Sequence, residues 1–398
     1  MEKLVGRPIV KQKIRLYVLS TSLSKKISLA KFRRKGKRIC LKPEETLRIP
    51  QLDRSDHTYG SINAADLIST NSKQLVVGAK REFFIYDLKT GQTVTHVKKH
   101  HFGNICNVKS WKNYVIVFTA DGPVKIIHLH DHRQKAYVLN HEFAGDYFGG
   151  YHAFSRNAEL EGNSLIYISK NCKLVYFDLS EITHLKSETI SQNLDFGSEH
   201  IGETEGGKFF IRLQAREVET SAKIDSLCLF QKFAYFASMD GSVYGFSRRV
   251  DHFTRDQPMN PKKLVHFQED GLDLTALEYY HGNIIAVMFN LSSRRACIKL
   301  FNVKTGLRSD AKISQQDRPT QKILMFVKRK MCFGIALNRG IDMHVFGIHR
   351  CQIFLFSQNI KLEATHICGI LFLDGKLTSH KLLVYGQDNF NKVFKVSL

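Results

Sequence analysis

The chain has few prolines, a single tryptophan and no paired cysteine motif. Its 398 residues include seven prolines, and its eight cysteines stand singly with no Cys-x-x-Cys pair. The spacing of a zinc ribbon is therefore missing. Because most of the cysteines lie in apolar runs, reduced buried thiols and a reducing compartment are expected. No proline-rich or glycine/serine-rich linker divides the chain, which indicates one compact unit with a tail.

Long apolar runs and catalytic motifs are missing as well. No run reaches the roughly 18 apolar residues of a membrane-spanning helix, and the N-terminus lacks the apolar core of a secretory signal. There is no Gly-x-Gly-x-x-Gly opening a helix, no P-loop, no Gly-x-Ser-x-Gly and no His-Glu-x-x-His. These absences predict an intracellular protein that is not an enzyme, with no cofactor and no membrane partner.

The best candidate for a metal site is a run of alternating histidines, His128, His130 and His132. In an extended segment their side chains would share one side and could bind zinc. Exposed turn residues are the commoner explanation of such a run. We therefore predict no metal.

Acidic residues are almost missing from the first 44 residues. This segment contains fourteen Lys and Arg residues against Glu2 and Glu44, so it carries +12 of the net charge of +22. Its densest part predicts a nuclear-import or nucleic-acid-binding patch. The basic residues of this patch are Lys31, Arg33, Arg34, Lys35, Lys37 and Arg38. A mitochondrial presequence and a solvated basic extension that packs locally are the alternatives.

The rest of the chain repeats a β pattern that is clearest at residues 74–97. Two apolar runs, 75–77 and 83–86, are separated by Lys80 and Arg81, and the second run is followed by a Lys-Thr-Gly turn. Such β-rich runs joined by polar turns predict a meander of strands. One hairpin cannot bury its apolar faces alone, so neighbours of the same kind are required.

Those neighbours follow at a spacing of roughly 40 to 50 residues. The expected units span 62–96, 105–139, 152–190, 224–267, 274–313, 323–356 and 365–398. Residues 195–220 fit either a long loop or a stray hairpin. The last unit is one strand short, and an isolated strand at 46–49 would complete it. We therefore predict an all-β fold, a single β-propeller of about seven four-stranded blades, in which the N-terminal strand closes the ring by pairing with the C-terminal strands. The predicted division is a basic extension, 1–44, and a propeller, 45–398.

Short motifs at the strand ends resemble those of the WD-repeat propeller family. The family's Trp-Asp pair corresponds to Tyr86-Asp87, Phe177-Asp178 and Phe301-Asn302. Asp-Gly turns stand where that family commonly turns, at Asp121-Gly122, Asp240-Gly241 and Asp374-Gly375. No Gly-His dipeptide precedes a blade. The resemblance covers about 350 residues of the chain and implies a non-catalytic binding platform.

Cations recur in the turns between the second and third strands of the expected blades. In a propeller of this family those turns open onto one face, so a cationic rim is expected. Its residues would be Lys80, Arg81, Lys170, Lys173, Arg294, Arg295, Arg339 and Lys392. Asp121 and Asp240 would interrupt it in the second and fourth blades. Such a rim attracts an acidic or phosphorylated peptide or an RNA backbone.

Two functional classes follow from the tail and the rim. The first is a protein-interaction scaffold in a nuclear or ribonucleoprotein assembly, binding protein partners and RNA or a phosphopeptide. The second is the substrate-recruiting subunit of a ubiquitin ligase, because the chain has a faint similarity to F-box/WD-repeat proteins. That similarity rests on Leu23, Ile27 and residues 29–38, and the Leu-Pro start of the F-box is missing. The predicted location is the nucleus or cytoplasm, ranked above the mitochondrion.

Overall fold

The computed structural model describes most of the chain after residue 39. The described residues are 40–46, 62, 64–79, 81–97, 104–120, 122–129, 135–143, 158–183, 201–204, 208–218, 224–230, 233–238, 240–247, 261–267, 272–290, 292–313, 320–328, 331–338, 342–349, 351–362, 367–373, 381–386 and 391–397. They are almost all strand, with one helical turn at 180–183. Within these residues, no helix has the length and apolar character needed to cross a membrane.

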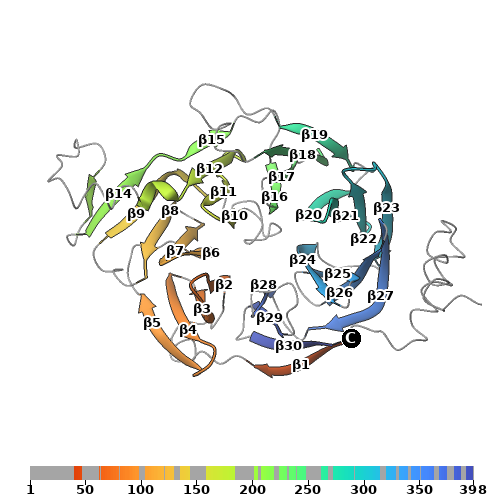
Figure 1. The fold of residues 1–398 in the computed structure, drawn as a ribbon, viewed down its shortest axis with the longest axis horizontal. Helices are drawn as coiled ribbons and strands as arrows, with labels where there is room; N and C mark the ends of the chain where they lie inside the picture. The colour runs from red at the N-terminus through yellow and green to blue at the C-terminus, as the bar shows by residue number, and fades with distance from the viewer. Residues whose placement is uncertain are drawn as a thin grey trace, which may run out of the picture.

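Seven sheets are arranged around a common axis as the blades of a propeller (Figure 1). Each blade begins at the axis and continues outward, strand by strand, with antiparallel pairing. The predicted all-β propeller of seven four-stranded blades is confirmed, and one blade carries two additional strands.

Corresponding strands of the seven blades can be grouped by their distance from the axis. The innermost strands are β2 (Ala64–Ile68), β6 (Ile105–Trp111), β10 (Ala158–Glu161), β16 (Ile224–Phe230), β20 (Asp273–Tyr280), β24 (Thr320–Lys328) and β28 (Ile367–Phe372). The second strands are β3 (Asn71–Ala79), β7 (Tyr114–Thr119), β11 (Ser164–Ile168), β17 (Phe233–Ser238), β21 (Asn283–Asn290), β25 (Met331–Asn338) and β29 (Lys381–Gly386).

The outer half of each blade has the same regularity. The third strands are β4 (Glu82–Asp87), β8 (Pro123–His128), β12 (Leu174–Asp178), β18 (Ser242–Ser247), β22 (Arg295–Asn302), β26 (Asp342–His349) and β30 (Asn391–Ser397). The fourth strands are β5 (Gln92–Val97), β9 (Lys135–Glu142), β15 (Arg216–Val218), β19 (Lys262–His266), β23 (Arg308–Ile313), β27 (Gln352–Lys361) and β1 (Cys40–Thr46).

The hydrophobic core lies between neighbouring blades. Between the second and third blades, for example, the Phe118 ring lies 4.8 Å from the Phe143 ring and 6.0 Å from the Tyr167 ring, centroid to centroid. All three side chains are almost completely buried. Apolar faces on both sides of a sheet explain the continuous apolar runs of the second and third strands.

The ring closes through the N-terminal strand. β1 pairs antiparallel with β30, from Cys40 opposite Ser397 to Thr46 opposite Lys392, with an irregularity between Pro43 and Glu45. The strand that closes the ring is therefore 40–46, which begins earlier than the predicted 46–49, and residues 47–49 lie outside the described residues. As the outermost strand, β1 needs hydrogen bonds on one side only, and that position tolerates a proline.

The third blade differs from its predicted extent of 152–190. Its fourth strand is β15, which follows an insertion containing β13 (Ile201–Thr204) and β14 (Lys208–Leu213). The β13–β14 hairpin joins the second blade, where β14 pairs in parallel with β9. The backbone nitrogen of Ala215 then donates a hydrogen bond to the Asn140 side chain at 2.7 Å. An open outer edge can pair with another strand, so the insertion links two blades.

The strand-end motifs form turns whose acidic or amide residue is a hydrogen-bond acceptor. Asp87 Oδ1 accepts bonds from the backbone nitrogens of Lys89 and Thr90 at 2.8 and 2.9 Å. In the fifth blade, Asn302 accepts the two corresponding bonds at 3.1 and 2.9 Å. Asp178 accepts one such bond at 2.9 Å. The Asp or Asn is thus required by the turn, whichever aromatic residue precedes it.

Candidate functional site

The turns between the second and third strands of all blades lie on one face of the propeller. This follows from the strand order, since every blade starts at its inner strand and reverses direction at each turn. Arg81 follows the second strand of the first blade, and Arg294 precedes β22 in the fifth blade. Arg295 is the first residue of β22. We call these three exposed side chains the rim arginines.

Two predicted rim lysines are exposed but form ion pairs. Lys170 Nζ lies 3.0 Å from Glu142 Oε2, on the outer strand of the neighbouring blade. Lys173 Nζ lies 3.1 Å from Glu217 Oε2, on the outer strand of its own blade. Ion pairs in such solvent-exposed positions are weak. The lysines of the third blade therefore add less positive charge to the rim than the sequence suggests.

The remaining predicted basic residues divide into two groups. Lys392 lies within β30, opposite Thr46 and Val384, and the prediction that placed it in a turn was wrong. The others lie outside the described residues; they are Lys80, Arg339, Lys31, Arg33, Arg34, Lys35, Lys37 and Arg38.

Asp240, which was expected to interrupt the rim, is held by its own turn. Its carboxylate accepts hydrogen bonds from the Ser242 backbone nitrogen and Oγ, both at 2.9 Å. Ser242 Oγ also lies 2.9 Å from His266 Nδ1. Partial burial raises the pKa of Asp240, but the hydrogen bonds from Ser242 and Ser238 outweigh this effect, so the pKa lies below the ordinary 3.8. The carboxylate is ionised at neutral pH and stabilises the turn. Asp121 lies outside the described residues.

The alternating histidines form no site in the described part of the chain. His128, the last residue of β8, packs its ring edge-on against Tyr114 at 5.0 Å between centroids. His130 and His132 lie outside the described residues. Within that part of the chain, no cluster of His, Cys, Asp or Glu side chains could hold a metal ion.

A second set of polar residues surrounds the axis and was not predicted. The third residue from the end of each inner strand occupies the same structural position in its blade. The first five blades have a polar or ionisable residue there, and the last two have Phe326 and Ile370. We call the five residues the inner girdle: Asp66, Lys109, Glu159, Cys228 and Glu278.

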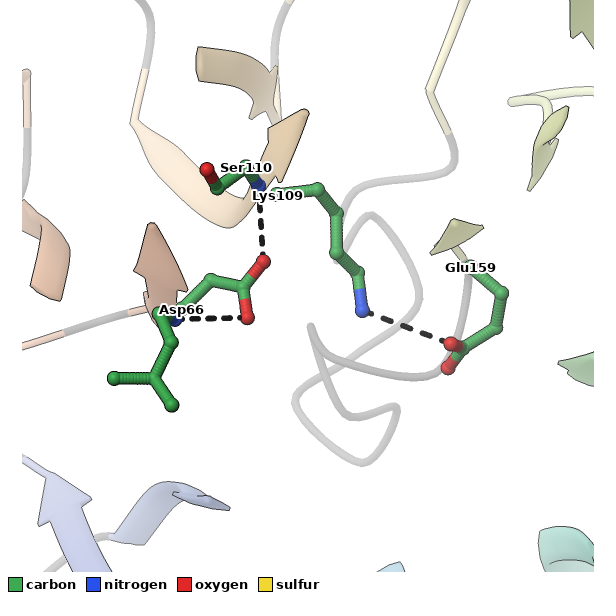
Figure 2. Close-up of polar contacts among 5 residues, drawn as sticks. Asp66, Lys109, Ser110 and Glu159 are labelled. Atoms are coloured by element: carbon green, nitrogen blue, oxygen red, sulfur yellow. Dashed lines mark hydrogen bonds and ion pairs between the residues drawn. The ribbon is translucent and has the colours of Figure 1, made fainter. Parts of the chain in front are cut away.

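Girdle side chains connect neighbouring blades, as Figure 2 shows. Lys109 Nζ extends from the second blade to Glu159 of the third and lies 3.7 Å from Glu159 Oε2. Asp66 of the first blade accepts a hydrogen bond from the Ser110 backbone nitrogen at 2.9 Å. The Lys109 side chain is 16% exposed and that of Glu159 is 30% exposed, so solvent reaches both.

The charges of the girdle affect one another across the axis. Burial on its own lowers the pKa of Lys109, but the carboxylates of Glu159, Asp66 and Glu278 together outweigh it and raise the pKa above 10.5. Burial, and then Glu278 and Glu159, raise the pKa of Cys228 well above 9.0. Lys109 is therefore charged and Cys228 is a neutral thiol at physiological pH.

The sequence contained a signal for the girdle. A single charged residue is the third from the end of several short apolar strands, as in Lys109 and Asp66. Because each lies in a different blade, their proximity becomes visible only when the seven inner strands are compared position by position.

Comparisons with known proteins support the fold. No protein-family model matches the chain, and a search of curated proteins finds no match. Among solved structures, the WD40 β-propeller domain of Doa1 matches with a TM-score of 0.56 and 12% identity, covering 90% of this chain and 97% of that chain. The fold is that of a WD40 β-propeller.

Two further structures give the same result. A chain of the Mitotic Checkpoint Complex matches with a TM-score of 0.55 and 12% identity, covering 91% of this chain and 93% of that one. The N-terminal domain of Nup159 matches with a TM-score of 0.54 and 10% identity, covering 90% and 95%. At this level of sequence identity, the similarity supports the fold alone.

Proposed function

We propose that this propeller is a non-catalytic scaffold that binds an acidic or phosphorylated segment of a protein partner at its cationic rim. The observation that carries the proposal is the placement of the rim arginines, which are exposed and stand at second-to-third-strand turns on one face. Arg294 and Arg295 are adjacent, so one phosphate or carboxylate could contact both. Guanidinium groups bind such anions with two parallel hydrogen bonds, which favours Arg over Lys at this position.

The setting that we propose is a multi-subunit assembly in the nucleus or cytoplasm. The basic segment 1–44, with a net charge of +12, favours a polyanion such as RNA as an additional partner. A structural neighbour taken from the Mitotic Checkpoint Complex supports a place among protein subunits. The alternative remains a substrate-recruiting subunit of a ubiquitin ligase, in which the same rim would read a phosphorylated or acidic degron.

The rim is tested by reversing its charge. A variant that combines Arg81→Glu, Arg294→Glu and Arg295→Glu should bind a labelled polyglutamate peptide about tenfold or more weakly than the unmodified chain does. The matched control has the same change in charge at exposed lysines at the opposite ends of the blades: Lys73→Glu, Lys89→Glu and Lys304→Glu. Equal affinities of the rim variant and the control would contradict the proposal.

The two settings give different results in affinity purification. A ribonucleoprotein subunit should lose partners when the lysate is treated with ribonuclease. A ligase subunit should retain a cullin-adaptor complex after the same treatment. Recovery of neither RNA nor a ligase would reject both specific settings and leave only the scaffold.

A further inference from the structure

Phe233 is the one aromatic residue among the exposed large apolar side chains of the described part of the chain. It is 47% exposed. It is the first residue of β17 in the fourth blade, directly after the turn that follows the inner strand. Because each blade reverses direction at every turn, turns of this kind lie on the face opposite to the rim arginines. The Phe233 ring is therefore accessible to a ligand on that opposite face.

Phe233 is the exposed end of a row of aromatic rings. It shares one side of β17 with Tyr235, because the pairing with β18 is regular, and the two rings lie 6.3 Å apart between centroids. Tyr235 in turn stacks on Tyr279 of the fifth blade, with 4.3 Å between centroids and 5° between the ring planes. The row thus lies at the seam between the fourth and fifth blades, and the two tyrosines fix its direction.

The fourth blade places a cation on the same side of its sheet. Gly245 is opposite Tyr235, and Lys262 is opposite Gly245, so these three residues share one side. A Cβ atom added at Gly245 would stand 3.2 Å from the Tyr235 ring, which shows that the ring lies directly over the glycine. Lys262 is exposed at the start of the outer strand. Its ammonium therefore borders the seam.

The fifth blade places a second cation there. Tyr279, Ile284, Phe301 and Arg308 are opposite one another on successive strands, so all four face the fourth blade. Arg308 is exposed, and its guanidinium carbon lies 5.9 Å from the centroid of the Phe301 ring. A guanidinium held over an aromatic ring keeps its N–H groups available for a phosphate.

The outer half of the seam is positively charged. Neither Lys262 nor Arg308 forms an ion pair within the residues that the structure describes. Asp310 is on the same side of β23 as Arg308, but it stands opposite Lys299, and Lys312 follows two residues later. Four cations thus border one carboxylate. An anionic partner is therefore attracted to this seam.

We propose that the seam patch, which consists of Phe233, Lys262, Phe301 and Arg308, binds single-stranded RNA. A base would stack on Phe233, and phosphates would contact Lys262 and Arg308. Exposed aromatic rings beside cations are the means by which proteins bind single strands without sequence preference. An apolar anchor of a protein partner fills a buried pocket instead. The inference rests on the RNA partner proposed above and gives that partner a place on the propeller itself, opposite to the rim.

Photocrosslinking locates the RNA on the full chain. An oligouridine of about ten nucleotides that contains 5-iodouridine is irradiated with the protein, and mass spectrometry identifies the crosslinked residues. We expect a crosslink at Phe233, in the tryptic fragment that follows Lys232, because 5-iodouridine reacts with aromatic side chains on which it stacks. Crosslinks confined to the basic segment 1–44 would overturn the proposal.

Substitutions at Phe233 distinguish base stacking from an apolar contact. Phe233→Leu keeps an apolar side chain and removes the flat ring, so it should weaken binding of fluorescein-labelled oligouridine by about fivefold or more, whereas Phe233→Tyr should bind normally. The control, Val94→Ala, shortens an exposed apolar side chain in the first blade and should leave the affinity unchanged. Unchanged affinity in Phe233→Leu would overturn the proposal in favour of an apolar protein segment.

Salt dependence tests the two phosphate contacts. Lys262→Ala combined with Arg308→Ala should make the plot of log affinity against log salt concentration shallower by about 1.4, since each phosphate contact on a single strand contributes about 0.7. Lys73→Ala combined with Lys89→Ala removes the same charge from exposed lysines of the first blade and should leave the slope unchanged. Equal slopes in the two variants would contradict the assignment of Lys262 and Arg308.

The rim and the seam patch can fail independently. Phe233→Leu should bind the polyglutamate peptide as the unmodified chain does, which also verifies its folding. The reversed-charge rim variant should still crosslink to RNA at Phe233. Loss of the crosslink with polyglutamate binding intact would overturn the seam patch and leave the rim. An intact crosslink supports the seam patch even if the rim variant and its control bind polyglutamate equally.

Discussion

Gly334 shows how closely the blades are packed at the scale of single residues. It lies opposite Phe346 in the sixth blade, and a Cβ atom added at Gly334 would stand 2.0 Å from Phe346 Cζ. The Phe346 ring is fully buried and has no room to move away. Only glycine allows the ring to lie directly on the neighbouring strand.

Gly334→Ala should therefore destabilise the propeller by about 1–3 kcal/mol, because the added methyl group overpacks the core. Urea unfolding measures this as a lower midpoint. Adding Phe346→Leu to the same chain makes room for the methyl group, so the double variant should lose less stability than the two single variants together. Additive losses would show that the two side chains do not compete for space.

The ionised carboxylate of Asp240 should make part of the stability depend on pH. Its pKa in the folded chain is below 3.8, so the stabilisation is complete above pH 3.8 and is lost as the pH falls through the lower folded value. Asp240→Asn keeps the shape of the side chain and removes the charge. The unfolding temperatures of the two chains should differ at a pH of about 6 and approach each other as the pH falls below 3.8. A constant difference would show that the charge contributes nothing.

At the scale of elements, most strands were predicted from local sequence signals. The strands that were not predicted pair with strands far away in the sequence. Paired apolar runs with Asp-Gly or Lys-Thr-Gly turns identified most blades, because those turns are stabilised by side chains next to them in sequence. For residues 195–220 the sequence left a long loop and a stray hairpin open, and the β13–β14 hairpin confirms the second alternative. The pairing of that hairpin with the second blade and the place of β15 could not be assigned in this way. Their partners, β12 and β9, are far away in sequence, and neither pairing leaves a local pattern.

β1 is the element on which ring closure depends. Deleting residues 1–46 removes this strand and exposes the edge of β30, so the unfolding temperature should fall by about 5 °C or more. Deleting residues 1–39 retains β1 and should leave the unfolding temperature unchanged. Differential scanning calorimetry on the two shortened chains makes the comparison. Equal unfolding temperatures would contradict the role of β1 in closure.

At the scale of the whole molecule, the propeller separates its charges by distance from the axis. The inner strands carry a net negative charge, and the rim arginines stand on one outer face. The sequence predicted Arg81, Arg294 and Arg295 because charged turn residues are recognisable along the chain. It did not predict the girdle, because Asp66, Glu159 and their partners belong to different blades and meet only in the folded ring.

Salt dependence of binding at the rim tests the central claim of a cationic platform most directly. Affinity of the full chain for a phosphorylated peptide is measured over a series of salt concentrations. The three chains compared are the unmodified chain, the reversed-charge rim variant and the control with Lys73, Lys89 and Lys304 changed to Glu. We expect the affinity of the unmodified chain and the control to fall steeply with salt, since exposed charges are screened. The rim variant should bind weakly with little salt dependence. The same steep dependence in all three chains would contradict the claim.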